Sequence, residues 1–224
     1  MNRRVLVVVA IVAIVLLAAG FAGLDRPLAE WVHSSGVAHA PVFVHGLGAL
    51  DTVSGLHVWY WLAGCVALGI GLVAGLARRT LRWPRVLVAA ALVQFATIAS
   101  MIAGKTCFGR LRPQQVLESG DWSHAWFAGG GSFPSGHSAF YFGLLLPLAA
   151  ACPIRWLRAV LLAIPVFAVL ARIDLEKHFL SDVSMSAALA ALYSLLVATM
   201  ARRWLAPRGP QASPIAASAR SALP

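Results

Sequence analysis

Long apolar stretches separated by short polar connections constrain this chain more than any other feature of its sequence. A membrane-spanning helix needs about 20 predominantly apolar residues. Hydrophobic residues make up 60% of the 224 positions, and the mean hydropathy is +0.79, which is typical of integral membrane proteins and not of soluble domains. The stretches predicted to span are 5–24, 53–77, 86–103, 135–151, 159–173 and 183–201. The sequence therefore predicts an all-α protein, a bundle of six transmembrane helices.

The predicted organisation is a single membrane domain, residues 1–205, followed by a tail, 206–224. The tail is rich in Pro, Ala and Ser, which favours a disordered cytoplasmic segment. The first span is either a cleaved signal peptide or a retained signal anchor, and its length of about 20 apolar residues favours the anchor. In the second span, Gly71 and Gly75 form a small-xxx-small pattern, which favours close helix packing within the chain over dimerisation.

Charge is distributed unevenly along the chain. The net charge is +10, but 12 of the 18 Lys and Arg residues cluster in alternate connections and at the termini rather than forming a nucleic-acid-binding patch. By the positive-inside rule, those clusters mark the cytoplasmic side, so both termini are predicted to be cytoplasmic. The clustered residues are Arg3, Arg4, Arg78, Arg79, Arg82, Arg85, Arg155, Arg158, Arg202, Arg203, Arg208 and Arg220. All eight acidic residues are assigned to the opposite, periplasmic side.

Three polar segments at the periplasmic ends of spans carry the candidate chemistry. In the last of them, His178 and Asp182 are four residues apart and would share one face of a helix. A carboxylate bonded to one ring nitrogen fixes the tautomer and leaves the other nitrogen free to attack an electrophile. Arg172 precedes them, and its planar guanidinium suits two phosphate oxygens. The alternative is a His–Asp pair that only stabilises the start of a helix.

The other two segments contain anion-binding features. Ser135 and Gly136 begin a predicted helix whose free amides favour an anion, and His137 stands beside them as a possible proton donor. Lys105 and Arg112 are two helical turns apart, whereas Arg110 lies off that face and is predicted to contact lipid headgroups. Helix capping, an interfacial histidine and snorkelling of Lys105 are the structural alternatives. All of these residues are predicted to lie on one side of the membrane, which favours a single site over separate structural roles.

The combination of the three segments resembles the type 2 phosphatidic acid phosphatase family, whose superfamily includes vanadium haloperoxidases and glucose-6-phosphatase. The matching residues are Lys105, Arg112 and Pro113, then Pro134, Ser135, Gly136 and His137, then Arg172, His178 and Asp182. The resemblance covers 105–182 by motif and the whole chain by its six-span layout. One departure is Ala171, where the family motif usually has Ser before the arginine.

The resemblance implies a role for each matching residue. His178 would be the nucleophile, Asp182 would orient it, and His137 would be the general acid and base. The phosphate oxygens would be held by Lys105, Arg112, Ser135, Gly136 and Arg172. No metal or other cofactor is expected, because three fixed cations can neutralise the phosphate. The remaining histidines, His33, His39, His45 and His57, are too sparsely spaced to predict a metal site.

The predicted function is hydrolysis of a lipid phosphomonoester or diphosphate through a phosphohistidine, in a bacterial-type inner membrane with the site facing the periplasm. Undecaprenyl diphosphate, phosphatidylglycerophosphate, phosphatidate and lipid A phosphates are all compatible substrates. Alternatives are a lipid phosphotransferase that uses the same phosphohistidine, and a non-catalytic lipid-binding or transport protein. A vanadate peroxidase is disfavoured by the membrane spans. No nucleic acid and no obligate protein partner is expected.

Overall fold

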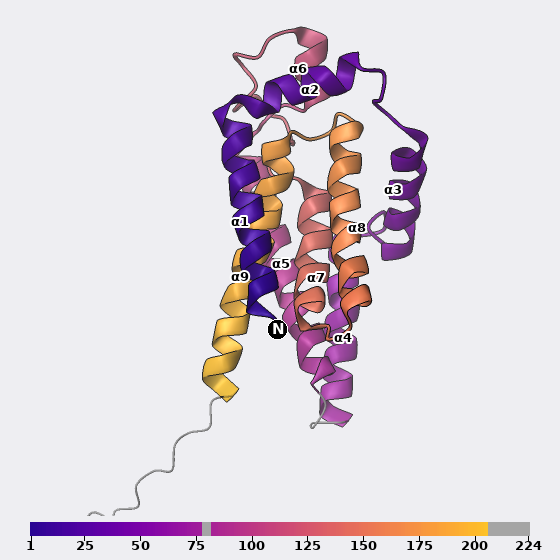
Figure 1. Ribbon diagram of the computed structural model, residues 1–224, viewed down its shortest axis with the longest axis vertical. Coiled ribbons are helices and arrows are strands. Elements are labelled where there is room, and N and C mark those ends of the chain that lie inside the picture. Colours follow the sequence, from indigo (N-terminus) through magenta and orange to yellow (C-terminus); the bar gives the residue numbers. More distant parts are fainter. Residues whose placement is uncertain (78–81, 206–224) are drawn as a thin grey trace, which may run out of the picture.

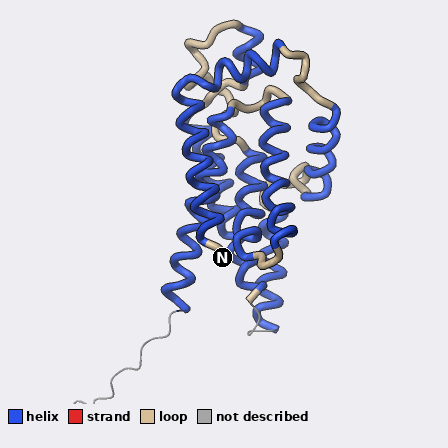
Figure 2. Tube along the Cα trace, in the orientation of Figure 1, coloured by secondary structure: helices blue, strands red, loops and turns tan. Residues whose placement is uncertain are grey.

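The computed structural model describes residues 1–77 and 82–205, and within these residues it contains helices and loops but no strand (Figure 2). The long helices are α1 (Arg3–Ala19), α4 (Leu62–Ala77), α5 (Trp83–Phe108), α7 (Gly136–Ala151), α8 (Arg155–Asp174) and α9 (Leu180–Leu205). They run roughly alongside one another in Figure 1, whereas α2 (Asp25–Ser34) and α6 (Pro113–Ser119) lie across one end. The shorter α3 (Pro41–Ser54) stands beside α8. The predicted all-helical class is confirmed.

Four helical stretches among the described residues are long and apolar enough to cross a membrane: Arg3–Ser34, Trp83–Ser119, Arg155–Asp174 and Leu180–Met200. The helices Leu62–Ala77 and Gly136–Ala151 are apolar but shorter. The chain is therefore a membrane protein by length and composition of its helices, and the count of six spans stays a prediction. The predicted tail, 206–224, lies outside the described residues.

The second predicted span is wrong at its start. It was expected to begin at residue 53, but α3 continues to Ser54, a turn follows, and α4 begins only at Leu62. Gly55 adopts a left-handed conformation at the end of α3, with φ of 73°, which favours glycine and ends the helix. The apolar run in the sequence is continuous from residue 58, so the sequence gives no sign of that turn.

Close helix packing at glycines holds the bundle together. A Cβ atom on Gly143 of α7 would lie 2.9 Å from the Cα atom of Gln94, so the backbones of α5 and α7 approach too closely for a side chain there. On α4, a Cβ atom on Gly71 would lie 2.9 Å from the carbonyl oxygen of Pro84. The small-xxx-small pattern of the second span therefore packs within the chain, against α5, as the sequence indicated.

Candidate active site

The predicted site residues come from the ends of several helices that meet at one end of the bundle, beneath α2 and α6. Lys105 lies in the last turn of α5, and Ser135 immediately precedes α7. Arg172 lies in the last turn of α8, His178 follows in the connection, and Asp182 lies in the first turn of α9. Helices that are far apart in sequence thus bring the three motif segments together.

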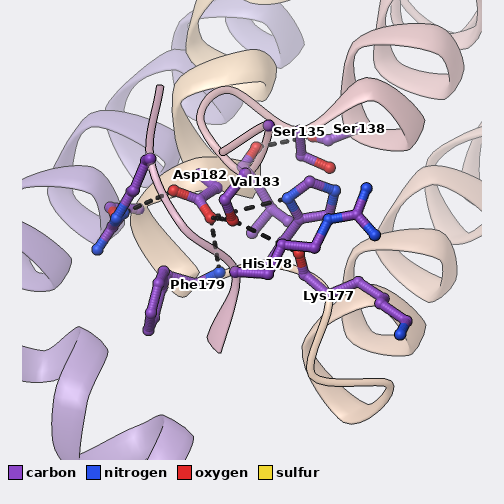
Figure 3. A network of polar contacts seen from close by, with 12 residues as sticks. Ser135, Ser138, Lys177, His178, Phe179, Asp182 and Val183 are labelled. Atoms are coloured by element: carbon purple, nitrogen blue, oxygen red, sulfur yellow. Dashed lines mark hydrogen bonds and ion pairs between the residues drawn. The ribbon is translucent and has the colours of Figure 1, made fainter. Parts of the chain in front are cut away.

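His178 and Asp182 face each other, as Figure 3 shows, although not at hydrogen-bonding distance. The Nδ1 atom of His178 lies 3.7 Å from Oδ2 of Asp182. The predicted pairing is therefore present as a close contact, whereas the expected hydrogen bond is not formed. With Nδ1 turned toward the carboxylate, Nε2 is the ring nitrogen that faces away from Asp182. Both side chains are buried, with exposures of 3% for His178 and 0% for Asp182.

Three donors fix the carboxylate of Asp182. Its Oδ1 accepts a hydrogen bond from Nη1 of Arg110 at 2.6 Å. Its Oδ2 accepts from the hydroxyl of Ser132 at 2.5 Å and from the backbone N–H of Phe179 at 2.8 Å. A carboxylate held by a cation and two further donors stays ionised and cannot rotate away from His178.

Arg110 corrects a prediction, because it is buried and is not a headgroup contact. Its Nη2 atom lies 2.8 Å from Oδ2 of Asp25, and so the guanidinium bridges the carboxylates of Asp25 and Asp182. Its plane lies between two aromatic rings, 4.4 Å from the centroid of Trp126 and 4.0 Å from that of Phe179. Arg110 is only 5% exposed, and through Asp25 it links the start of α2 to the site. Arg110 therefore holds in place the carboxylate that faces His178.

The site contains a group of cations and buried polar atoms that is suited to binding a phosphate. We call this group the cradle. Arg112, Arg172 and Lys105 are close enough to interact electrostatically with one another. Lys105 donates a hydrogen bond to the carbonyl oxygen of Gly131. Among the described residues, the buried side-chain atoms without a hydrogen-bond partner are Ser135 Oγ, Arg172 Nε, His178 Nδ1, Arg110 Nε and Gln94 Oε1, and all but the last belong to residues of the site or its support. Buried polar atoms are seldom left without partners unless a ligand or water serves them.

The start of α7 adds backbone donors to this cradle. Ser135 has extended backbone angles (φ −73°, ψ 126°) and Gly136 begins the helix, so the first amides of α7 have no carbonyl partner within it. A Cβ atom on Gly136 would lie 2.9 Å from the hydroxyl oxygen of Tyr60. Tyr60 was not predicted as a site residue. Burial raises the pKa of Tyr60, although Arg172 and Arg112 oppose that change, so its hydroxyl remains a donor beside the cradle.

His137 has a carboxylate partner that the sequence reasoning missed. Its Nε2 atom lies 2.9 Å from Oδ2 of Asp51, a residue of α3. The other oxygen of Asp51 accepts a hydrogen bond of 2.8 Å from the hydroxyl of Tyr141. Burial acts to raise the pKa of Asp51, but hydrogen bonding and charge from His137, together with the Tyr141 hydroxyl, hold that pKa below its ordinary value. Asp51 is therefore ionised.

Burial also determines the protonation state of His178. Removal from water, reinforced by the positive charges of Arg172 and Lys105, lowers the pKa of His178 to about 3 despite the nearby carboxylate of Asp182. The ring is consequently neutral at physiological pH. A neutral imidazole has the free electron pair that a nucleophile needs.

The remaining histidines do not form a metal centre. Within residues 1–77 and 82–205, no group of three His, Cys, Asp or Glu side chains is arranged to hold a metal ion. His33 forms an ion pair of 2.9 Å with Glu176, at the outer edge of the site. Ala171, which replaces the usual serine, is fully buried in an apolar cluster that includes Phe140 and Tyr141. An apolar side chain suits that environment.

A family model matches the part of the chain that contains most of the candidate site residues. The PAP2 superfamily matches residues 83–206, more than half of the sequence, and the match contains Lys105, the start of α7, Arg172, His178 and Asp182. The chain belongs to the PAP2 superfamily. Comparisons with curated proteins and with solved structures find no match. Membership of the PAP2 superfamily supports a phosphatase-type hydrolase acting on phosphate esters, in agreement with the neutral histidine, its carboxylate and the cluster of cations.

Proposed function

We propose that this PAP2 protein is a lipid phosphatase that hydrolyses a phosphomonoester or diphosphate of a membrane lipid through a phosphohistidine. The observation that carries the proposal is the buried His178, which lies beside the fixed carboxylate of Asp182 and within the electrostatic reach of Arg172 and Lys105. Nε2 of His178 attacks phosphorus, and the bond from phosphorus to the lipid oxygen breaks. His137 protonates the departing oxygen, so the lipid leaves as an alcohol or as a phosphomonoester.

The second half of the reaction regenerates the enzyme. Water attacks the phosphohistidine and gives a proton to His137, the P–N bond breaks, and inorganic phosphate leaves. Lys105, Arg112 and Arg172 neutralise the equatorial oxygens in both steps, while Ser135 and the amide of Gly136 add hydrogen bonds. Phosphoryl transfer depends mainly on this positioning and charge stabilisation. No metal ion is needed in this scheme.

An apolar groove supports a lipid substrate. It has a volume of about 410 Å³ and lies between α1, α8 and α9, with Leu16, Leu170 and Val183 among its lining residues. Two further lining residues, Ile173 and Leu180, also line a small cavity that reaches His178. A hydrocarbon chain in the groove would therefore lead to a headgroup at the site.

We place the site on the periplasmic face of the inner membrane, with six spans and cytoplasmic termini, as the charge distribution favours.

The decisive test is the His178→Ala variant, with His124→Ala as its control. The His124 side chain is 83% exposed and lies outside the site. Purified His178→Ala is expected to release inorganic phosphate from short-chain phosphatidate at least about 10³-fold more slowly than wild type. His124→Ala should retain wild-type turnover. Wild type should also form a radiolabelled phosphoenzyme, keep its activity in a strong chelator, and transfer no phosphate to added lipid alcohols.

Wild-type turnover in folded His178→Ala would overturn the nucleophile assignment. Complete loss of wild-type activity in chelator, restored by a divalent metal, would contradict the metal-free scheme. Phosphorylated lipid alcohol in place of inorganic phosphate would identify a phosphotransferase.

A further inference from the structure

The pair formed by Asp51 and His137 joins the site to a part of the chain outside the PAP2 match. Asp51 lies on α3, whereas the match begins at residue 83. We propose that Asp51 is the positioning residue for the general acid His137, so that each catalytic histidine has its own buried carboxylate. The inference rests on the proposed phosphatase function, because it assigns a partner to the proton donor of that reaction.

Helix α3 is attached to the bundle in a way that holds Asp51 in place. At its start, the backbone N–H of Ala40 donates a 3.0 Å hydrogen bond to Oδ2 of Asp174 at the end of α8. In its first turn, the ring of Phe43 packs at 5.4 Å on that of Phe167, also from α8. The end of α3 then presents Asp51 to α7. Contacts near the start of the helix thus help to hold a carboxylate near its end.

Both oxygens of Asp51 are used, and the carboxylate is shielded from water. One oxygen accepts from Tyr141 and the other lies against Nε2 of His137, while the residue is only 4% exposed. The other charged or titratable groups acting on His137 are Arg172 from α8 and His57 from the turn after α3. Asp51 is the acidic group among them, so it is the one that favours the protonated ring.

This geometry assigns the two ring nitrogens. Asp51 holds the proton on Nε2, and so Nδ1 is the atom that donates a proton to the departing lipid oxygen. When water later attacks the phosphohistidine, Nδ1 recovers a proton and the carboxylate stabilises the imidazolium that forms. Without Asp51, the ring can turn over or adopt the other tautomer, and the proton is no longer presented to the leaving group.

The experiment compares Asp51→Asn with wild type on two substrates. Dioctanoyl phosphatidate has a poor leaving group and needs a general acid, whereas 4-nitrophenyl phosphate has a good one and does not. For Asp51→Asn, kcat/KM on dioctanoyl phosphatidate should fall at least about tenfold, and up to the 10²–10⁴-fold that general acid catalysis typically contributes. The loss on 4-nitrophenyl phosphate should be severalfold smaller. The double variant Asp51→Asn with His137→Ala should lose no more activity than His137→Ala alone.

Glu176→Gln is the matched control. Glu176 is also a buried carboxylate, and its side chain pairs with His33 of α2 at 2.9 Å rather than with His137 or a residue of α3. A merely structural effect should reduce activity on both substrates by the same factor. This is the result expected for the control variant. Equal losses on both substrates in Asp51→Asn, or additive losses in the double variant, would overturn the inference. The proposed phosphatase function would still stand, because His178→Ala tests that separately.

A pair of glycine variants tests the same inference with Asp51 intact. A Cβ atom on Gly46 of α3 would lie 2.7 Å from the ring of Phe167, whereas a Cβ atom on Gly48 would meet nothing within 4 Å. Gly46→Ala should therefore shift α3 and reproduce the leaving-group-dependent loss in milder form, about two- to tenfold on dioctanoyl phosphatidate. Gly48→Ala should leave both activities unchanged. Wild-type activity in both variants would argue against a role for the position of α3.

Discussion

At the scale of single residues, Arg110 shows how the position of His178 depends on groups beyond its own carboxylate partner. Its guanidinium satisfies Asp182 on one side and Asp25 on the other, and Ser181 adds a hydroxyl acceptor at 2.6 Å. Removing one member of a buried ionic group leaves an uncompensated charge, which is more costly than losing an exposed pair. The orientation of Asp182, and through it of His178, therefore rests on Arg110.

Arg110→Gln is expected to lower the free energy of unfolding by about 3–5 kcal/mol, because the carboxylates of Asp25 and Asp182 would lose their shared cation. Thermal unfolding of the detergent-solubilised protein measures the effect. The control is Arg26→Gln, since Arg26 is 60% exposed and pairs with Glu30 at 2.8 Å on the same face of the molecule. That change should cost no more than about 1 kcal/mol. Equal costs in the two variants would argue against a special role for the buried network.

The sequence could predict only part of this site. His178, Asp182 and His137 stand in short motifs whose spacing indicates their chemistry. No short motif indicates the roles of Arg110 and Asp51. Arg110 pairs with Asp25, 85 residues away in the chain, and Asp51 pairs with His137, 86 residues away. An isolated acidic residue at the end of an apolar segment is also what an interfacial helix shows. Only the packing of helices reveals that these charges are buried and paired.

At the scale of helices, the packing of α8 creates the apolar groove that we propose for the lipid chain. It packs closely on α7 but only loosely on α9, and the apolar groove occupies the space that remains beside α1. Helix periodicity in the sequence predicts α8, but it cannot predict this gap, which depends on how three helices pack. The same limit explains the wrong start of α4, where local turn chemistry at Gly55 overrides an apolar run.

Leu170→Trp tests whether the groove holds a lipid chain. Leu170 lines the groove and is 49% exposed, so a larger side chain there would fill part of it. The KM for dioleoyl phosphatidate should rise about tenfold, equivalent to about 1.4 kcal/mol of lost binding, while turnover of 4-nitrophenyl phosphate stays unchanged. Val160→Trp is the matched control, because Val160 is 47% exposed on α8 and does not line the groove. Equal kinetics for the two variants on the long-chain lipid would exclude this groove as its binding site.

At the scale of the whole molecule, the arginine-rich helix ends lie at one end of the bundle and the candidate site lies at the other. Arg3 and Arg4 begin α1, Arg82 precedes α5, and Arg155 begins α8, all at the end away from the site. The site end instead contains the buried acids together with Lys105, Arg112 and Arg172. Cytoplasmic segments of membrane proteins carry an excess of Lys and Arg. Our proposal that the site faces the periplasm rests on this separation.

Cysteine labelling measures this orientation directly. In a variant with Cys65, Cys107 and Cys152 replaced by alanine, single cysteines at His124 and Arg155 would report on the two ends, since both positions are exposed and lie on opposite sides of the bundle. An impermeant maleimide added to intact spheroplasts should label His124→Cys, whereas Arg155→Cys should react only after the membrane is lysed. The reverse pattern would place the site in the cytoplasm. The substrate would then have to come from the cytoplasmic leaflet, because a headgroup can reach His178 only from the leaflet that borders the site.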